Sequence, residues 1–213
     1  MRMISASEKN RPLSDYRQSL KGRILKTAME MFSAHGIKAV KMDDIASRLG
    51  ISKRTLYELY ENKEVLLSEC VKSHNEDMKA QMREFASTAE NVMDVVLFVY
   101  QLKNQEILDM SPLFFEDIQK YPSVTSYLEQ QRQDSHQDFL AFMLRGVNEG
   151  YFRADVNYQL FSILFEALGG YMREHRLYQQ YSSAELFNSV LLVMLRGMCT
   201  PKGVEVLDRF LKK

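Results

Sequence analysis

The residues best suited to chemistry lie in one short basic stretch near the N-terminus. Residues Ser52–Thr55 read Ser-Lys-Arg-Thr, and Tyr57 and Tyr60 follow shortly after them. Hydroxyl and cationic groups of this kind donate hydrogen bonds to phosphate oxygens and to the edges of bases. The first turn of a helix also favours anions, so a helix beginning here would present several donors together. The stretch predicts contacts to nucleic acid; the alternative is an ordinary helical hairpin with a solvated basic end.

The residues around this stretch have the spacing of a helix-turn-helix. Ile45 and Ala46 place apolar and small side chains on the inner face of a short helix over residues 43–49, and Leu56 does the same for the next helix. Gly50 permits a tight turn between the two helices, and Ser52 is a good cap for the second. In such a unit the second helix is free to enter the major groove of DNA.

The remaining chain also has a helical pattern. Only 4 Pro and 9 Gly occur in 213 residues, and apolar residues recur at helical rather than alternating spacing. Asn62 is expected to cap a fourth helix that runs to about Phe85, and further helix starts are expected at Ser111-Pro112, Ser182 and Thr200-Pro201. We therefore predict an all-α protein of about nine or ten helices, with a small N-terminal bundle linked to a larger helical body.

Charge is distributed unevenly along this chain. The totals balance at 28 Lys+Arg and 28 Asp+Glu, but residues 1–63 hold 13 Lys+Arg and 7 Asp+Glu, a net charge of +6. A basic N-terminal third indicates an anionic partner for that part, and a random fluctuation of the surface is the alternative. The sequence has no apolar run of membrane-spanning length, no secretory signal and only two cysteines, so we expect a cytoplasmic protein without membrane partners.

Catalytic and metal-binding patterns are missing from the sequence. The four histidines have no partner at convincing metal-ligand spacing, and there is no phosphate-binding glycine loop or nucleophile elbow. We expect no enzyme activity, no catalytic residues, no metal and no cofactor.

Residues 22–67 resemble the DNA-binding domain of the TetR (tetracycline repressor)/AcrR-type family of bacterial transcriptional regulators. The matching elements are IL-x2-A-x3-F-x3-G, followed by DDIA-x3-GISK-x-TLY-x2-Y-x2-KE-x-L. The resemblance implies a flexible N-terminal arm over 1–17, a helix-turn-helix domain over 18–65 and a helical ligand-binding and dimerisation domain over 66–213. It further implies a homodimeric, repressor-like regulator that binds a palindromic double-stranded DNA operator and is released by a small-molecule effector.

The resemblance also assigns DNA contacts. Glu58-Leu59 stands where the family often has His-Tyr, so the target sequence does not transfer. Arg17 and Lys21 are expected to help from the N-terminal arm. The predicted DNA-binding residues are Lys41, Ser52, Lys53, Arg54, Thr55, Tyr57, Tyr60 and Lys63. Tyr60 stands where the family often has Phe, so the alternative for it is a core position from which its hydroxyl reaches out.

A cluster of aromatic residues in the C-terminal body suits a cavity for an apolar or aromatic ligand, with ordinary core packing as the alternative. Asp109, Glu116 and Glu166 could meet a cationic ligand, or could be solvated surface charges. The predicted ligand contacts are Phe98, Leu102, Phe114, Phe115, Phe139, Met143, Phe165 and Tyr171.

Two C-terminal helices, one from about Asn157 and one over Leu186–Met198, are apolar almost all round. A helix that is apolar on both sides needs a cover on both sides, which favours a symmetric four-helix bundle with a second subunit over a deeper monomer core. The predicted dimer contacts are Phe161, Leu168, Val190, Leu191 and Met194.

Two rival functions remain at this point. One is a helical small-molecule-binding protein whose N-terminal bundle binds a protein partner. The other is a helical enzyme that uses a cavity in the body, which would need an ordered catalytic constellation there.

Overall fold

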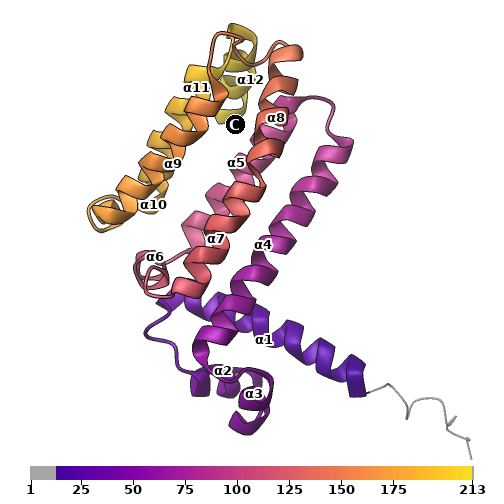
Figure 1. The fold of residues 1–213 in the computed structure, drawn as a ribbon, viewed down its shortest axis with the longest axis vertical. Helices are drawn as coiled ribbons and strands as arrows, with labels where there is room; N and C mark the ends of the chain where they lie inside the picture. Colours follow the sequence, from indigo (N-terminus) through magenta and orange to yellow (C-terminus); the bar gives the residue numbers. More distant parts are fainter. Residues whose placement is uncertain (1–12, 213) are drawn as a thin grey trace, which may run out of the picture.

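The computed structural model describes residues 13–212, and the chain within them folds as helices (Figure 1). These residues form no β-strand, although an isolated antiparallel bridge joins Phe152 to Cys199. The predicted all-α fold is confirmed. The helices run from α1 to α12, more than the nine or ten expected, because several are short.

The N-terminal bundle consists of α1 (Leu13–His35), α2 (Met42–Leu49) and α3 (Lys53–Leu59). Ile24, Ala28 and Phe32, spaced four residues apart on α1, are fully buried. This spacing places them on one face of the helix, which packs against α2 and α4. The predicted arm over 1–17 is helical from residue 13, and its first twelve residues lie outside the described part.

Helix α4 (Lys63–Thr88) connects the bundle to the body as one uninterrupted run of 26 residues (Figure 1). The side chain of Asn62 accepts a hydrogen bond from the backbone N–H of Val65 and caps the helix, as the sequence predicts. At its other end α4 reaches Thr88, three residues beyond the expected Phe85.

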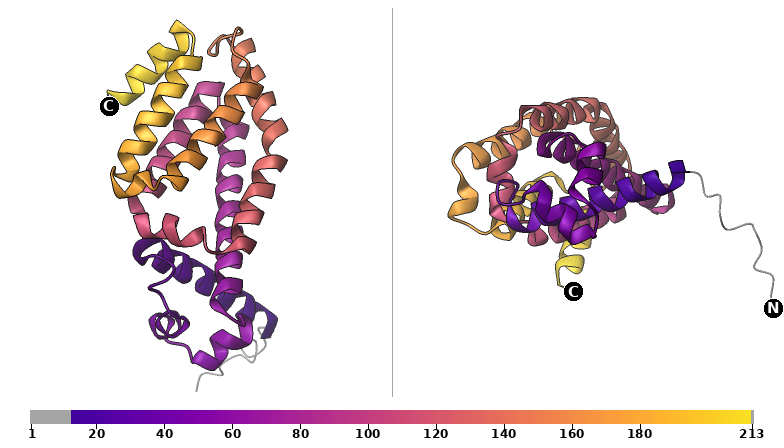
Figure 2. Two further views of the ribbon diagram at one scale, coloured as in Figure 1. Left: turned by 60° about the vertical axis from the view of Figure 1, so that its left-hand side comes forward. Right: turned by 90° about the horizontal axis from the view of Figure 1, so that it is seen from below.

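The body lies above the bundle in Figure 1 and in the left-hand view of Figure 2, with α6 at the junction between them. The expected caps Ser111, Ser182 and Thr200 each accept a hydrogen bond from a backbone N–H two or three residues ahead. The helices of the body are α5 (Val92–Asp109), α6 (Pro112–Ile118), α7 (Pro122–Asp134), α8 (His136–Asn148), α9 (Tyr158–Glu174), α10 (Ser183–Phe187), α11 (Val193–Met198) and α12 (Pro201–Leu211).

The segment predicted as one helix over Leu186–Met198 is divided. α10 ends at Phe187, a π-helical stretch follows over Asn188–Leu192, and α11 begins at Val193. A π-turn adds a residue to one helical turn and rotates the side chains that follow, so a single helical wheel misplaces the face of α11.

Buried apolar residues form two clusters. The first joins the bundle to the body, since it contains Phe32 and Ile45 of the bundle together with Phe114 of α6 and Val124 of α7. The second lies in the body around Met93, Phe152 and Leu207. No helix within residues 13–212 combines the length and apolarity that a bilayer crossing needs.

Candidate nucleic-acid interface

The turn between α2 and α3 is built from local interactions. Gly50 adopts the left-handed conformation, with φ 66° and ψ 31°, and ends α2. The N–H of Ile51 then donates to the carbonyl of Ala46 at 3.1 Å, which closes the turn. Ile45 and Ala46 are buried beneath it, so the turn sets the direction in which α3 leaves.

Helix α3 is anchored on one side and exposed on the other. Leu56 is fully buried, whereas Lys53, Arg54 and Tyr57 are exposed. Ser52 Oγ accepts the backbone N–H of Thr55 at 3.0 Å and lies 2.8 Å from its hydroxyl oxygen, Oγ1. The cap therefore uses part of the hydrogen-bonding capacity of Ser52 and Thr55, while the two cations and Tyr57 point into solvent.

Both exposed cations of α3 have carboxylate partners that the sequence reading did not identify. Lys53 forms an ion pair with Asp43 of α2, and Arg54 Nε donates to Glu58 Oε1 at 2.7 Å one helical turn ahead. The hydrogen bond and charge of Glu58 raise the pKa of Arg54, and those of Asp43 raise the pKa of Lys53. Spacing of four residues could have indicated the Arg54–Glu58 pair.

Tyr60 fits the core alternative and not the DNA contact. Only 5% of its surface is exposed, and burial raises the pKa of its phenol to about 12. The ring belongs to the cluster that joins α1, α2 and α4. Tyr60 therefore acts as a core residue that holds the end of α3, and Tyr57 is the tyrosine that faces outward.

Lys63 also differs from the expected phosphate contact. Its ammonium Nζ donates to the carbonyls of Ile37 at 2.9 Å, Lys38 at 3.4 Å and Val40 at 3.0 Å. An ammonium has three donors, so these bonds account for all of them. Burial lowers the pKa of Lys63. Lys63 supports the loop between α1 and α2, while Lys41, at the start of α2, is exposed and free to approach a phosphate.

The same loop is held from the body by Asp117 of α6, a residue that the sequence reading did not identify. Asp117 Oδ2 accepts the backbone N–H of Lys38 at 2.7 Å, and Oδ1 accepts from Lys120 Nζ at 3.0 Å. Burial by itself would raise the pKa of Asp117, but these hydrogen bonds outweigh it and hold the pKa below its usual range. Nothing in the local sequence indicates this contact, because the partners lie 79 positions apart.

Gly36 allows this close approach of α6. Its φ is +82°, and an added Cβ would lie 2.8 Å from the Cβ of Leu113. The backbone N–H of Ser111 also donates to the carbonyl of Ser33 at 2.8 Å. The bundle and α6 are thus joined by backbone contacts as well as by the Asp117 carboxylate.

The body contains a cavity of about 610 Å³ bounded by α4, α5, α8, α9 and the segment 188–198. Of the predicted ligand contacts, Phe139, Met143 and Phe165 line it.

The other predicted ligand contacts lie elsewhere. Phe98 stacks on Phe85 with ring centroids 4.1 Å apart. Phe114 and Phe115 pack at the junction with the bundle, and Tyr171 is 53% exposed. Leu102 lines a different cavity of about 780 Å³ between α1, α4 and α5. Side chains on one helix face can fill different spaces, and the sequence does not tell these spaces apart.

The predicted dimer contacts mostly face the interior. Phe161, Leu191 and Met194 line the 610 Å³ cavity, and Leu168 and Val190 are half-buried. The exposed side of α9 is formed instead by other large apolar residues: Leu160, Ile163, Leu164 and Tyr171. Phe165 lines the cavity and is also 42% exposed. Both sides of α9 are apolar, so its sequence did not determine which side the subunit itself covers.

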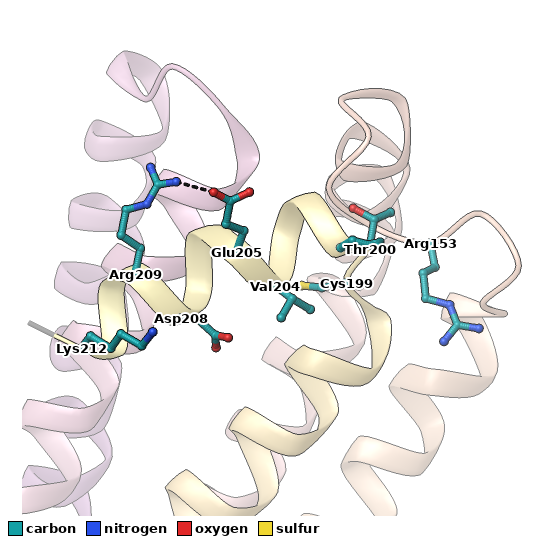
Figure 3. Close-up of a pocket in the computed structure, with 9 residues that line it drawn as sticks. Arg153, Cys199, Thr200, Val204, Glu205, Asp208, Arg209 and Lys212 are labelled. Carbon is teal, nitrogen blue, oxygen red and sulfur yellow. Dashed lines mark hydrogen bonds and ion pairs between the residues drawn. The ribbon is translucent and has the colours of Figure 1, made fainter.

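A third hollow, of about 890 Å³, lies along α12 (Figure 3). Its charged side chains are mostly paired with each other or with neighbours. Arg209 bonds to Glu205 at 2.7 Å, Arg153 to Asp155 at 2.6 Å, and Asp208 to Arg196. Within the described residues no group of His, Cys, Asp or Glu could hold a metal ion.

Comparison with known proteins agrees with this geometry. The sequence profile described as "Bacterial regulatory proteins, tetR family" matches residues 24–70, which run from α1 into α4. Over 201 residues the chain is 25% identical to the HTH-type transcriptional repressor KstR2 of Mycobacterium tuberculosis, and the match covers 87% of this chain and 96% of that protein.

Solved structures share the fold. A TetR-family transcriptional regulator from Agrobacterium tumefaciens superposes with a TM-score of 0.68 at 16% identity, covering 86% of this chain and 100% of the other. A transcriptional regulator from Saccharomonospora viridis, solved in complex with choline, superposes with a TM-score of 0.67 at 16% identity, covering 86% and 99%.

Proposed function

We propose that this chain, a TetR-family protein by its residues 24–70, is a DNA-binding transcriptional repressor that works as a homodimer and releases DNA when a small molecule binds its body. The observation that carries the proposal is helix α3. Its buried Leu56 anchors it on the bundle, while Lys53, Arg54 and Tyr57 face outward. A short, anchored helix with a cationic outer face can enter a major groove without unfolding its support.

DNA contact is assigned to the residues that the structure leaves accessible. Lys53, Arg54 and Tyr57 meet the groove from α3, and Lys41 meets a phosphate at the start of α2. Ser52 and Thr55 form the cap and have remaining acceptor and donor capacity for the backbone of DNA. Tyr60 and Lys63 act as supports beneath this surface.

The dimer is supported by the exposed face of α9. Leu160, Ile163 and Leu164 are each more than half exposed, and Phe165 is 42% exposed. Soluble proteins rarely leave such a continuous row of large apolar side chains in water. A second copy packed about a two-fold axis would cover this row. The dimer would then carry two α3 helices, one from each subunit, which must lie about 34–36 Å apart to reach successive major grooves.

Ligand response is supported by the 610 Å³ cavity, whose volume falls within the range of roughly 300–1,000 Å³ usual for small-molecule sites. α4 forms one wall of the cavity and also begins at the α1–α2 loop through Lys63. A ligand that favours one arrangement of α4 therefore changes the population of the DNA-binding state. Repression, as against activation, is supported by the name of the KstR2 relative.

The test is selection of bound duplexes from a random DNA pool, followed by gel shifts of the enriched sequence at several salt concentrations. We expect a palindromic sequence and an affinity that falls steeply with salt, since each phosphate contact contributes a slope of about −0.9. Arg54→Ala should weaken binding without changing the melting temperature. Failure to enrich any sequence, or a flat salt response, would overturn the proposal and favour a bundle that binds a protein partner.

A further inference from the structure

The 610 Å³ cavity has its polar side chains at one place. Lys79 and Arg83 come from α4, and Ser135 and Asp138 from the start of α8. The walls from α5, α9 and segment 188–198 are apolar apart from Tyr100. This separation describes a site for a molecule with one polar end and a long apolar part.

The two cations lie on the same face of α4, because four residues separate them. Lys79 is half-buried, and its Nζ donates to the neutral Oε1 of Gln131 at 2.6 Å. The Arg83 guanidinium has no hydrogen bond or ion pair within residues 13–212. In the described part of the chain, therefore, no carboxylate neutralises either charge.

Asp138 is the one carboxylate that lines the cavity within the same described residues, and it forms no ion pair there. It stands in the first turn of α8, where the helix dipole stabilises a negative charge without a cation. The polar corner thus has two positive groups and one negative group. Arg83 and Asp138 are exposed and Lys79 is half-buried, so the polar corner lies where the cavity meets solvent. Its net positive charge favours a ligand whose polar end is negative.

We propose that this cavity binds an elongated apolar molecule that ends in a carboxylate, with Arg83 and Lys79 holding the carboxylate. The inference rests on the proposed function and gives its effector a chemical class. The guanidinium offers two parallel donors that match a carboxylate, and Lys79 supplies a second charge. The apolar chain lies against Val99, Phe139, Phe161 and Met194.

Three probes that share a twelve-carbon chain test the class: dodecanoate and dodecylamine, each below its micellar concentration, and 1-dodecanol below its solubility limit. Calorimetric titration into the full chain without DNA should show dodecanoate binding at least about tenfold more tightly than the other two, since hydrogen bonds to charged groups are worth that much. Equal or tighter binding of dodecylamine, or no binding of any probe, would overturn the assignment.

Two variants test the residues. Arg83→Gln should weaken dodecanoate binding about tenfold and leave 1-dodecanol unchanged. Asp138→Asn should tighten dodecanoate binding and weaken dodecylamine binding, because it removes a negative charge from the corner. Lys72→Gln is the matched control, since Lys72 lies on α4, pairs with Glu69 at 3.0 Å and does not line the cavity. An unchanged dodecanoate affinity in Arg83→Gln contradicts the assignment.

The two proposals fail separately in these experiments. If a palindrome is enriched but dodecanoate does not bind, the proposed ligand class is wrong and the proposed function as a DNA-binding regulator still stands. If dodecanoate binds more tightly than the other two probes and no DNA is enriched, the proposed DNA-binding function is wrong and the assignment of the cavity still stands.

Discussion

At the residue scale, the exposed cations of α3 are held by the protein's own carboxylates. Glu58 accepts from Arg54 at 2.7 Å, and Asp43 pairs with Lys53. Phosphates must compete with these partners, and the carboxylates themselves repel DNA. Exposed ion pairs of this type contribute little to stability, so their main effect falls on the affinity and orientation of the cations.

We expect Glu58→Gln to strengthen DNA binding about three- to tenfold, because it frees Arg54 and removes a negative charge from the interface. The salt dependence of binding should become steeper by about one phosphate contact. Fluorescence anisotropy with the selected duplex at several salt concentrations measures both effects. Glu205→Gln is the control, since Glu205 and Arg209 form the same four-residue pair on α12. Weaker binding by Glu58→Gln would show that Glu58 positions Arg54 for its contact.

At the element scale, two helices fix the loop between α1 and α2 from opposite directions. Lys63 of α4 donates to three of its carbonyls, and Asp117 of α6 accepts the N–H of Lys38. The orientation of α2 and α3 therefore depends on helices that also belong to the body. Both contacts were absent from the sequence interpretation, because hydrogen bonds between residues 23 to 79 positions apart leave no local pattern.

We expect Asp117→Asn to lower the free energy of unfolding by about 1.5–3 kcal/mol at pH 7, the scale of a lost hydrogen bond to a charged group. The folded-state pKa of Asp117 is depressed, so its contribution is fully present above the unfolded-state pKa and is lost as the pH falls through the folded pKa. The difference between wild type and Asp117→Asn should shrink below about pH 4.

Denaturant unfolding at pH 7 and at acidic pH measures this difference. Asp155→Asn is the control, because Asp155 also pairs with a cation, Arg153, but is exposed. The pKa of Asp155 is lowered, like that of Asp117. A difference for Asp117→Asn that grows as the pH falls would contradict the assigned role of its charge.

At the scale of the whole molecule, the exposed face of α9 carries several large apolar residues that a partner subunit could cover. Its residues Leu160, Ile163 and Leu164 are each more than half exposed. The dimer contacts predicted on this helix, Phe161 and Leu168, are half-buried, and the dimer surface proposed above consists of their exposed neighbours.

If the proposed dimer forms through this face, we expect Leu164→Glu to convert it to a folded monomer, because a carboxylate on the interface would lose its water without gaining a partner. DNA binding should fall with it, since one subunit reaches only one half-site. Sedimentation analysis gives the mass and circular dichroism checks the fold. Leu144→Glu, at a leucine of α8 that is 60% exposed, is the control and should leave the mass unchanged. A dimer that persists in Leu164→Glu places the interface elsewhere.

What could be predicted from the sequence depended on the range of the interactions involved. Helices α2 and α3 and their turn follow from Gly50, the Ser52 cap and residues within one helical turn, so they were predicted well. The Asn62, Ser182 and Thr200 caps are equally local and were found. The roles of Tyr60 and Lys63 and the cavity-facing side of α9 depend on packing between distant segments. The sequence shows that these residues are apolar or cationic, but it does not show which distant side chains pack against them.

Because α4 is uninterrupted, a small tilt of the helix at the cavity displaces its N-terminal end at Lys63. Lys63 and Lys79 are sixteen positions apart on this helix, which corresponds to about 24 Å of axial length. A tilt of about 5° around the cavity would displace the Lys63 end by about 2 Å over that length. A displacement of that size equals a large part of a hydrogen-bond length, so it would strain the three carbonyl contacts of Lys63 before any helix unwinds.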